Sequence, residues 1–376
     1  MKQPPAFNLA ALRLGVKMFF LVSGTQIHAA MTAESLPECN ARFLNTNGWT
    51  GADVASTVPL DGDRTLWLFG DTWVGPVVSN RHTKATMVNN TVALQQGRDL
   101  ATAKLEYFWS QGQNGKPAAL FTPADGRGFF WLSSGVWMTN RLHLFVMQIE
   151  KTDGTGAFAF RNIGHSLLTV TNPAAPPPQW RTLQKKIPFG RETQTRHTEF
   201  GAATLHHDGW IYIFGCDEDR KRGTFPRKHA TVGRAPENAL DDFARWQFWD
   251  GRAWQADFEK AARIFDRAAD EYSVSWIPEL RQFVAICTPN GLNAEIRLRQ
   301  APVANGPWSE PTVIYRCPEF GRPRGTFCYA AKGHPEISAT NEILVTYATN
   351  TGDFWFGAAH ADIYVPRCIR VRFKVE

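Results

Sequence analysis

The sequence lacks any long hydrophobic run, which argues against a membrane-spanning helix. No apolar stretch in its 376 residues approaches the roughly 18 residues that a span requires. Helical patterning is also scarce, since only two segments, 241–249 and 254–269, place apolar side chains at helical spacing. We expect these two segments to form a small helical insertion in a chain that is otherwise all-β.

Several motifs that define common enzyme classes are missing as well. The chain contains neither G-x-S-x-G nor H-E-x-x-H, and no glycine-rich segment lies in the strand–loop–helix frame of a phosphate loop. Its six cysteines include no C-x-x-C pair and no histidine cluster accompanies them, so we expect neither a metal nor a cofactor. Cys317 and Cys328 are close enough in sequence to bridge a loop in an oxidising compartment. Cys216 and Cys287 lie in apolar runs typical of buried thiols.

Charge of one sign is not concentrated anywhere along the chain. The 41 Lys and Arg exceed the 35 Asp and Glu by 6, but they are dispersed rather than gathered into a basic stripe. An ordinary solvated surface explains this distribution, and we expect no nucleic-acid partner. Aromatic residues are abundant instead, with 26 Phe, 14 Trp and 7 Tyr. Many of them must pack a β-rich core, and the surplus of Trp is typical of clefts that stack against sugar rings.

Residues 1–30 have the pattern of a signal peptide rather than of folded structure. Basic residues precede a short apolar stretch at 18–22, and small residues at 27–30 form a site of the kind that a signal peptidase cleaves. We therefore expect a secreted or periplasmic protein, with residues 31–376 forming a single catalytic domain. The alternative is a disordered or mis-assigned start upstream of a cytoplasmic enzyme.

The chain from residue 51 onward repeats one pattern five times. Each copy has a strand of small residues, then a turn, then a strand of aromatic and β-branched residues. The first strands are predicted at 51–56, 130–134, 199–203, 271–275 and 334–338. The second strands are predicted at 66–69, 142–145, 210–214, 282–286 and 342–346.

The spacing of the copies indicates the fold. They are 80, 68, 72 and 63 residues apart when counted between Asp53, Ser133, Gly201, Ser273 and Glu336. A hairpin and two further short strands at such a period are typical of propeller blades. Small residues on each first strand suit an innermost strand, where five chains crowd around an axis. We predict a five-bladed β-propeller, because a β-sandwich would not explain the repeat.

Acidic residues open several copies, and a propeller would bring them together. The N-terminal ends of the innermost strands converge on one end of the central channel, so we expect a cluster of Asp53, Glu199, Glu271 and Glu336. Asp71 ends the second strand of the first copy and should lie close to Asp53. Carboxyl groups gathered in one cleft raise one another's pKa. Two of them flanking a glycosidic bond are the minimum for glycoside hydrolysis.

Each of these acidic residues also has a plainer structural interpretation. Asp71, taken alone, is typical of a turn or cap residue. Glu199 and Glu271 are placed to pair with nearby arginines, and Glu336 is placed to pair with His334. A catalytic interpretation therefore depends on the fold bringing the carboxyl groups together.

Two stretches of the first copy carry a resemblance to a known family. Trp-Thr-Gly-Ala-Asp-Val-Ala-Ser at 49–56 and Leu-Trp-Leu-Phe-Gly-Asp-Thr at 66–72 resemble the opening of glycoside hydrolase family 183, the endo-D-arabinanases. Those enzymes are five-bladed propellers, once known only as a domain of unknown function. Further similar stretches are found at 89–91, 272–273, 348–350 and 364–367. The resemblance implies that Asp53 and Asp71 are the catalytic carboxylates.

The resemblance also implies a mechanism. Related propeller glycosidases use the Asp of the first innermost strand as the general base of an inverting reaction. Asp53 would then activate water and Asp71 would protonate the leaving oxygen, although the reverse assignment and a retaining reaction stay open. The implied substrate is an arabinofuranose-containing polysaccharide such as D-arabinan, and the choice between endo and exo action stays open.

The sequence thus predicts a monomeric glycoside hydrolase that acts on a polysaccharide. Four aromatic residues are candidates to stack against sugar rings, although each also suits the core: Trp49, Trp73, Trp131 and Tyr272. The polar candidates for substrate contacts are Asn90, Glu199, Glu271, His334 and Glu336. Two alternatives are a non-catalytic carbohydrate-binding propeller and a glycosidase of the same fold that acts on other sugars. The paired carboxylates favour an enzyme, because a binding module has no need of them.

Overall fold

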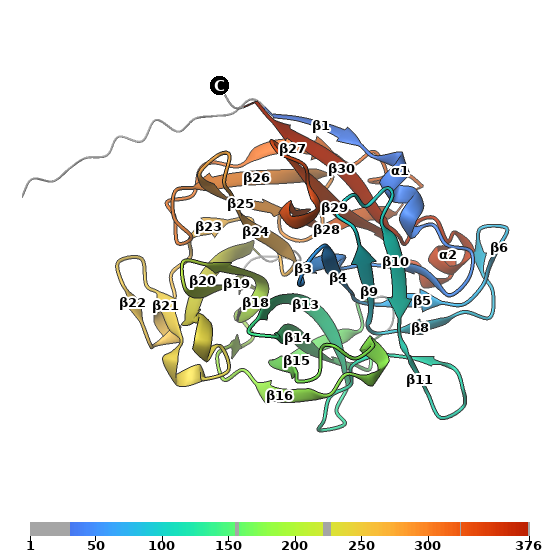
Figure 1. Cartoon of the computed structure of the whole chain (residues 1–376), viewed down its shortest axis with the longest axis horizontal. Helices are drawn as coiled ribbons and strands as arrows, with labels where there is room; N and C mark the ends of the chain where they lie inside the picture. Colours follow the sequence, from blue (N-terminus) through green and yellow to red (C-terminus); the bar gives the residue numbers. More distant parts are fainter. Residues whose placement is uncertain (1–30, 155–157, 221–226, 324, 375–376) are drawn as a thin grey trace, which may run out of the picture.

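The computed structural model describes residues 31–154, 158–220, 227–323 and 325–374. The expected signal segment, residues 1–30, lies outside these ranges. Five antiparallel sheets form a ring around a central axis (Figure 1). The five-bladed β-propeller predicted from the repeat is confirmed. Within the described ranges, no helix combines the length and the hydropathy that a membrane crossing requires.

Each blade is built around four antiparallel strands. Blade 1 contains β3 (Ser56–Pro59), β4 (Arg64–Phe69), β9 (Thr91–Gln96) and β10 (Lys104–Phe108). Blade 2 contains β13 (Phe129–Met138), β14 (Arg141–Lys151), β15 (Phe160–Val170) and β16 (Thr182–Lys186). Blade 4 contains β24 (Tyr272–Ile277), β25 (Gln282–Cys287), β26 (Glu295–Ala301) and β27 (Thr312–Arg316). Blade 5 contains β28 (Thr326–His334), β29 (Glu342–Thr351), β30 (Pro366–Phe373) and β1 (Met31–Ser35).

Blade 3 is larger, and short elements decorate the ring. Blade 3 contains β17 (Arg191–Glu192), β18 (Arg196–His207), β19 (Trp210–Asp219), β20 (Arg227–Pro236), β21 (Gln247–Trp249), β22 (Trp254–Gln255) and β23 (Phe265–Asp266). The strands outside the blades are β2 (Trp49–Ala52), β5 (Thr72–Val74), β6 (Val77–Val78), β7 (Arg81–His82), β8 (Thr86–Val88), β11 (Ser110–Gln111) and β12 (Pro117–Ala118). The α-helices are α1 (Pro37–Asn40) and α2 (Phe354–Ala359). The 3₁₀ turns are η1 (Ala41–Phe43), η2 (Pro177–Gln179), η3 (Glu237–Ala239), η4 (Phe243–Arg245), η5 (Phe258–Lys260) and η6 (Pro335–Ile337).

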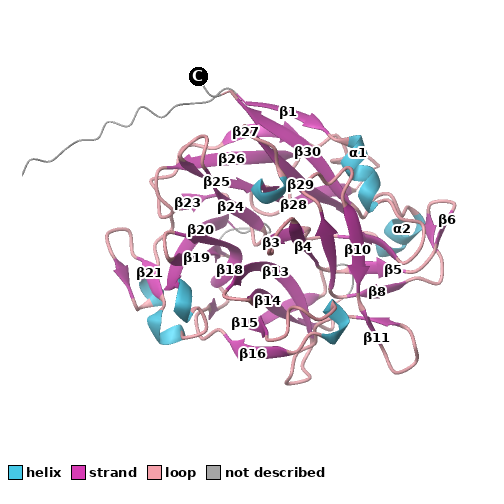
Figure 2. Ribbon diagram, in the orientation of Figure 1, coloured by secondary structure: helices cyan, strands magenta, loops and turns pink. Residues whose placement is uncertain are grey.

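The innermost strands β3, β13, β18, β24 and β28 contact one another in a closed ring around the axis (Figure 2). Hydrogen bonds join neighbouring innermost strands directly. Ser134 Oγ donates to the Gly201 carbonyl oxygen over 2.7 Å, and the Gly333 N–H donates to Ser273 Oγ over 2.7 Å. The small residues that the repeat places here are what allow such close approach.

Hydrophobic clusters fill the spaces between neighbouring blades, with one cluster at each of the five interfaces. Between blades 5 and 1 the cluster includes Trp49, Trp67 and Phe69 from the first blade and its approach, packed against Leu344. Trp67 is fully buried, and its Nε1 donates a 2.8 Å hydrogen bond to Gln95 Oε1. Truncating such a Trp to Ala costs about 3–5 kcal/mol. The aromatic second strands therefore hold the blades to one another.

The ring is closed by strands from the two ends of the chain. Strand β1 pairs antiparallel with β30, from Met31 opposite Phe373 to Ser35 opposite Ile369, and Figure 1 shows the two strands side by side. Blade 5 thus contains both the first and the last strand of the described chain. Without β1 its outer edge would be unpaired.

The expected helices in the insertion are wrong. Segment 241–249 contains the turn η4 and strand β21, whereas 254–269 contains strand β22, turn η5 and strand β23. Asp242 and Asp257 cap the two turns by accepting hydrogen bonds from Ala244 and Glu259 N–H groups. Beyond the first turn, pairing of Phe248 with Gly233 on blade 3 draws the chain into a sheet. Tertiary packing overrides the weak helical pattern here.

The first strand of the fifth copy was also placed wrongly. The innermost strand of blade 5 is β28, which ends at His334, so the predicted strand at 334–338 is in fact the end of β28 followed by η6. The second strands of all five copies and the first strands of copies two to four were predicted within a few residues. The error in the fifth copy displaces two candidate site residues.

Candidate active site

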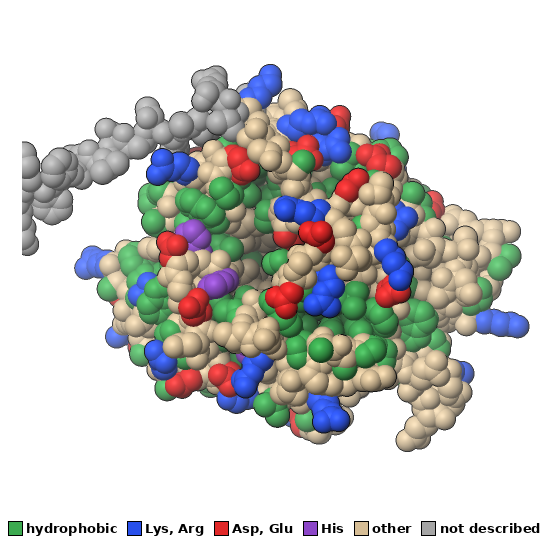
Figure 3. Space-filling model, in the orientation of Figure 1, with side chains coloured by type: hydrophobic (Ala, Val, Ile, Leu, Met, Phe, Trp, Pro, Cys, Tyr) green, Lys and Arg blue, Asp and Glu red, His purple; other side chains and the backbone are tan. Residues whose placement is uncertain are grey.

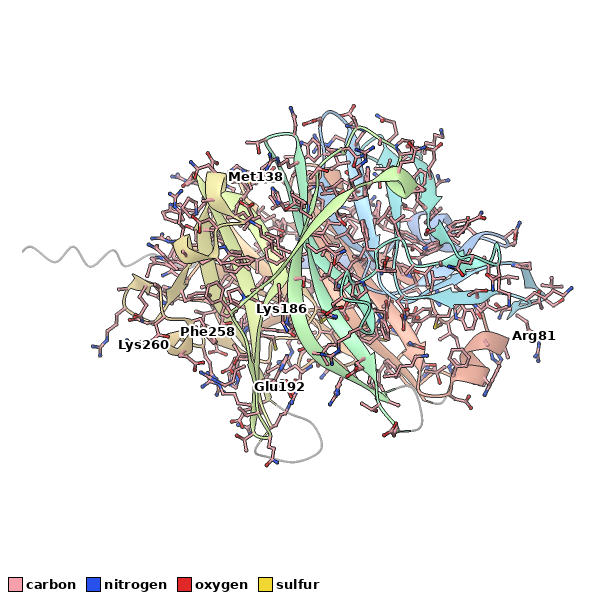
Figure 4. All side chains as sticks on the ribbon, turned by 90° about the horizontal axis from the view of Figure 1, so that it is seen from below. Arg81, Met138, Lys186, Glu192, Phe258 and Lys260 are labelled. Carbon is pink, nitrogen blue, oxygen red and sulfur yellow. The ribbon has the colours of Figure 1, made fainter. Side chains whose placement is uncertain are left out.

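A pocket with a cavity volume of about 580 Å³ opens where the innermost strands begin. Each blade contributes a side chain to its wall: Asp53, Trp131, Glu199, Glu271 and Tyr329, in order from blade 1 to blade 5. Figure 4 shows this axis from the side. Met138, which ends β13, lies in its upper part, and Glu192, which lines the pocket, lies near the lower end.

Bulges in three innermost strands position the pocket-lining residues. The register shifts between Leu132 and Ser134, between Phe200 and Ala203, and between Tyr329 and Lys332. A bulge bends its strand and turns the adjacent side chains. Trp131, Glu199 and Tyr329 lie at or directly before these bulges and line the pocket.

The backbone after Asp53 makes a strained turn. Val54 and Ala55 have φ values of 65° and 46°, in the left-handed region that residues with a Cβ rarely occupy. The Asp53 carbonyl oxygen accepts hydrogen bonds from the Ala55 N–H over 2.8 Å and from the Gly70 N–H over 3.4 Å. Such strain persists only where the surrounding structure enforces it, and it is commonly found at functional sites.

Gly70 explains why Asp53 and Asp71 belong to one site. A Cβ placed on Gly70 would lie 2.4 Å from Asp53 Oδ1. Only glycine lets the chain that carries Asp71, between β4 and β5, pass this close to the Asp53 carboxyl group. Steric crowding by Asp53 therefore explains why the Phe-Gly-Asp-Thr motif has a glycine before Asp71.

Asp53 is a half-buried carboxyl group with acidic neighbours. Its Oδ2 accepts a 2.8 Å hydrogen bond from the Tyr329 hydroxyl. Burial, followed by repulsion from Glu271 and Asp71, raises the pKa of Asp53 to about 8. Asp53 therefore carries a proton at neutral pH.

Asp71 has a different set of partners. Its Oδ1 accepts hydrogen bonds from Trp131 Nε1 over 2.8 Å and from Asn89 Nδ2 over 3.0 Å. Burial raises the pKa of Asp71 as well, but both of these donors favour the ionised carboxylate and oppose that rise. The Tyr364 hydroxyl donates to the Asp71 carbonyl oxygen over 3.1 Å and fixes the backbone. The two aspartates thus share a pocket, but their carboxyl groups have different hydrogen-bond donors.

Lys332 links Glu271 to the turn that follows Asp53. Its Nζ lies 3.1 Å from Glu271 Oε1 and donates a 2.8 Å hydrogen bond to the Val54 carbonyl oxygen. Lys332 is only 2% exposed, so its charge needs these partners. Glu271 is therefore held in place beside Asp53 by a buried cation.

Glu199 is the centre of a buried polar network. Its Oε2 lies 3.0 Å from both His165 Nε2 and His197 Nε2, and it accepts a 3.2 Å hydrogen bond from Asn162 Nδ2. Burial works against the carboxylate, but the histidine partners outweigh it and hold the pKa of Glu199 well below its usual range. Burial also lowers the pKa of His197, yet bonding to Glu199 and Glu192 raises it overall to about 9. Glu199 is a permanent anion, unlike Asp53.

Comparison with known proteins gives the chain a family. Residues 38–373 match the family described as "Domain of unknown function (DUF5005)". The chain belongs to this family. No curated protein matches the sequence.

Several solved structures are similar to this chain, and the first of them supports its fold. A "putative hydrolase" from Bacteroides ovatus ATCC 8483 is similar with a TM-score of 0.70 at 18% identity, over 91% of this chain and 90% of that one. A thermostable family-43 glycoside hydrolase has a TM-score of 0.47 at 13% identity, over 88% and 92% of the two chains. An alpha-L-arabinofuranosidase from Clostridium thermocellum ATCC 27405 has a TM-score of 0.44 at 9% identity, over 78% and 80%.

Four of the predicted substrate contacts of the DUF5005 chain are structural residues instead. Trp49 packs in the core with Nε1 bonded to Thr91, and Tyr272 is buried with its hydroxyl bonded to the Gly215 carbonyl. Asn90 is fully buried, and its Nδ2 donates to two backbone carbonyls over 2.9 Å. Trp73 stacks on the ring of a neighbouring histidine and does not line the pocket. These interpretations were wrong because buried rings and amides cannot contact a sugar.

His334 and Glu336 lie at the opposite end of the channel from Asp53. They line a second cavity of about 340 Å³, where the innermost strands end. Figure 3 shows a hollow near the centre of this face. His334 is fully buried between Thr57 Oγ1 at 2.6 Å and Thr346 Oγ1 at 2.7 Å. The predicted grouping of Glu336 with the other carboxylates is wrong, because the fifth copy was out of register.

The partners of the two aspartates also include residues that the sequence did not single out as a site. Tyr329, Tyr364 and Asn89 contact the two aspartates. Asn89 and Tyr364 lie inside stretches that carried the family resemblance, so a signal for them existed. Tyr329 carried no such signal, because the misplaced fifth strand hid it. The sequence placed Glu199 to pair with a nearby arginine. Arg196 instead pairs with Asp217 over 2.7 Å, and the partners of Glu199 are histidines.

Proposed function

We propose that this protein is a glycoside hydrolase in which Asp53 and Asp71 are the catalytic pair. The proposal is carried by two half-buried carboxyl groups that have different hydrogen-bond partners and line one pocket, to which all five blades contribute. In general acid–base catalysis, two acidic residues often lie in surroundings that give them different pKa values, so that one is protonated and the other is ionised. Trp131, Glu199 and Glu271 are proposed to shape the pocket around the substrate.

The partners of the two aspartates favour one assignment of roles. Asp53, with a pKa raised to about 8, holds the proton that the leaving glycosidic oxygen needs. Asp71, which accepts two N–H hydrogen bonds, is the carboxylate that takes a proton from the attacking water. This reverses the roles implied by the family resemblance. With water as the nucleophile the anomeric centre inverts, and the proton gained by Asp71 returns to solvent as Asp53 is reprotonated.

The pocket wall favours an uncharged substrate. Among the described residues that line it, seven are Asp or Glu, of which Asp53 carries a proton, and four are cationic: Arg161, Lys228, Arg220 and His197. Each of these cations already has an acidic partner: Arg220 pairs with Glu192 and Glu218, Lys228 with Asp270, Arg161 with Glu150, and His197 with Glu199. An anionic sugar would meet a wall with a net negative charge. We therefore propose a neutral glycan.

The finer specificity rests on the resemblance of 49–56 and 66–72 to the endo-D-arabinanases. We propose endo-cleavage of an arabinofuranose-containing polysaccharide, with D-arabinan as the first substrate to try. We also propose export, because residues 1–30 have the pattern of a cleaved leader. N-terminal sequencing of the protein recovered from the periplasm or the medium of its host tests the export proposal.

The test of function is the release of reducing ends from D-arabinan, with L-arabinan, xylan, galactan and a uronate-containing glycan in parallel. Chromatography of early products distinguishes endo from exo action, and NMR of the first-formed anomer distinguishes inversion from retention. Cleavage of a neutral glycan supports the proposal, and cleavage of a glycan other than arabinan corrects only its substrate. Binding without cleavage across the panel overturns it in favour of a carbohydrate-binding propeller.

A further inference from the structure

Four of the six cysteines lie in two pairs at the borders of blade 5. Cys39 and Cys368 belong to the hydrophobic cluster between blades 5 and 1, and Cys317 and Cys328 to the cluster between blades 4 and 5. In each pair the two cysteines are free thiols that lie near each other. All four are at most 5% exposed.

Hydrogen bonds to the backbone of Cys368 hold it against the turn that carries Cys39. The Leu36 N–H donates to the Cys368 carbonyl oxygen over 3.0 Å, and the Cys368 N–H donates to Asn40 Oδ1 over 2.6 Å. The Cys39 N–H itself donates to the Leu36 carbonyl oxygen over 3.1 Å. Both backbone groups of Cys368 are thus bonded to the single helical turn that carries Cys39. One main-chain bond and one bond to the Asn40 side chain thus hold the backbone of Cys368 against the turn that carries Cys39.

The second pair is fixed in the same way by one short segment of blade 4. The Cys317 N–H donates to the Ala294 carbonyl oxygen over 2.8 Å, and the Asn293 N–H donates to the Cys328 carbonyl oxygen over 3.1 Å. Because residues 293 and 294 are consecutive, the two cysteines flank the same point of the chain.

The remaining two cysteines have other partners. Cys287 Sγ donates to the Arg267 carbonyl oxygen over 3.6 Å, and Cys216 interacts with Asp270. Both are buried in separate strands, β25 and β19. The pairing is therefore selective for the cysteines at the borders of blade 5.

We propose that Cys39–Cys368 and Cys317–Cys328 form two disulfides that lock the propeller ring. The first joins α1, which directly follows the closing strand β1, to β30. The second joins the end of the outer strand β27 of blade 4 to the inner strand β28 of blade 5. Blade 5 contains the first and last strands of the ring, and it would be fastened on both sides. Of the two, the bridge between Cys39 and Cys368 closes much the longer loop and therefore disfavours the unfolded chain more.

Each bridge forms by thiol–disulfide exchange with a small disulfide such as oxidised glutathione. One cysteine thiolate attacks the glutathione disulfide, which releases one glutathione thiolate and leaves a mixed disulfide. The second cysteine then displaces the other glutathione. The pair loses two protons and two electrons, and the oxidised glutathione becomes two reduced molecules. Because the thiols are buried in the folded protein, the reaction belongs to folding, before the N-terminal segment packs.

The test is a thiol count on the full chain refolded in a mixture of oxidised and reduced glutathione. The protein is denatured without reductant, alkylated with iodoacetamide and weighed. We expect two alkylated cysteines, Cys216 and Cys287, and six after prior reduction. Non-reducing peptide mapping should yield the two cross-linked peptides. Alkylation of all six without reduction, or a different pairing, overturns the proposal, and no glycosidase activity is needed for the measurement.

Variants separate the two bridges and test the lock. Cys39→Ala should free Cys368 and leave Cys317–Cys328 intact, whereas Cys287→Ala is the control that should leave both bridges. Reductant should lower the Tm of the wild type by several degrees and should not change that of the Cys39→Ala/Cys317→Ala double variant. If reductant leaves the wild-type Tm unchanged, the lock is refuted. Should the variants fail to fold, the wild-type thiol count and Tm still decide.

Discussion

The hydroxyl of Tyr329 donates a 2.8 Å hydrogen bond to Oδ2 of Asp53, although 276 positions separate the two residues. Tyr329 belongs to blade 5 and Asp53 to the approach of blade 1, so ring closure creates this bond. A donor favours the ionised carboxylate. The bond therefore opposes the burial and the nearby carboxylates that raise the pKa of Asp53 to about 8.

Tyr329→Phe should move the alkaline limb of the pH–rate profile to higher pH. Without the hydroxyl donor, the pKa of Asp53 rises further, so the proposed general acid keeps its proton to a higher pH. The measurement is kcat/KM against pH, which reports the free enzyme. Tyr315→Phe, on the outer strand β27, is the matched control and should leave the profile unchanged. A limb that moves to lower pH would contradict Asp53 as the acid.

Asp53→Asn and Asp71→Asn should each lower kcat/KM by at least about 100-fold, because an amide can neither give nor take the proton. Reducing-end assays on the best substrate of the panel measure the loss. Asp208→Asn is the matched control, since Asp208 is 86% exposed at a hairpin turn and lines neither cavity. Circular dichroism should show native spectra for all three variants. Near-wild-type activity in either catalytic variant would remove that residue from the mechanism.

Gly70→Ala should abolish most activity while leaving the fold intact. The new Cβ would lie 2.4 Å from Asp53 Oδ1 and would push the carboxyl group from its position. A displacement of about 1 Å can cost about 100-fold in rate. Gly352→Ala is the control, because no atom lies within 4 Å of a Cβ placed there. Equal activity of the two variants would mean that this contact does not position Asp53.

The pairing of Asp53 with Asp71 could be predicted because both residues flank the first hairpin. The local pattern of strand, turn and strand fixes which ends meet, and the Gly-Ala-Asp and Phe-Gly-Asp-Thr motifs marked both positions. Glu199 and Glu271 line the same pocket as Asp53 for the same reason, since each lies at the start of an innermost strand whose position was predicted. The local sequence pattern was enough to locate a site residue wherever that residue lies next to a strand that the pattern clearly predicts.

The predictions for the remaining residues were wrong for physical reasons that a single sequence does not reveal. In blade 5 the innermost strand contains a bulge and a left-handed Ala330 with φ 55°, which break the alternation of small residues. The strand was therefore predicted at the next segment, 334–338, which put Glu336 at the wrong end of the channel. Trp49 and Tyr272 are aromatic residues beside the site, but burial against neighbouring blades depends on packing that has no period along the chain.

Glu199→Gln should destabilise the protein by about 3–5 kcal/mol, because it breaks a buried ionic network. The pKa of His197, raised to about 9 by this carboxylate and Glu192, should fall toward its usual value. Urea unfolding measures the first effect and NMR titration of the histidine measures the second. Glu237→Gln is the matched control, since Glu237 pairs with His206 at an exposed site and should contribute less than about 1 kcal/mol. Equal losses would show that Glu199 is not held as a buried anion.

Asp53→Asn should change how stability depends on pH. The pKa of Asp53 is about 8 in the folded protein, above its ordinary value of 3.8, so between these values the folded state binds a proton that the unfolded state lacks. The contribution of Asp53 to the free energy of unfolding is therefore fully present below pH 4 and is lost as the pH rises toward 8. His197, with a folded pKa of about 9 against 6.5, adds a loss between those two values.

The amide of Asp53→Asn carries no charge at any of these pH values, so the variant should lose the Asp53 part of this slope and keep the His197 part. It should therefore be more stable than the wild type at pH 8, by an amount on the order of a few kcal/mol, with a smaller difference at pH 5. Urea unfolding of both proteins at the two pH values makes the comparison, with Asp208→Asn expected to follow the wild type. Parallel curves for Asp53→Asn and the wild type would mean that Asp53 is already ionised in the folded protein, and the role of acid would then pass to Asp71.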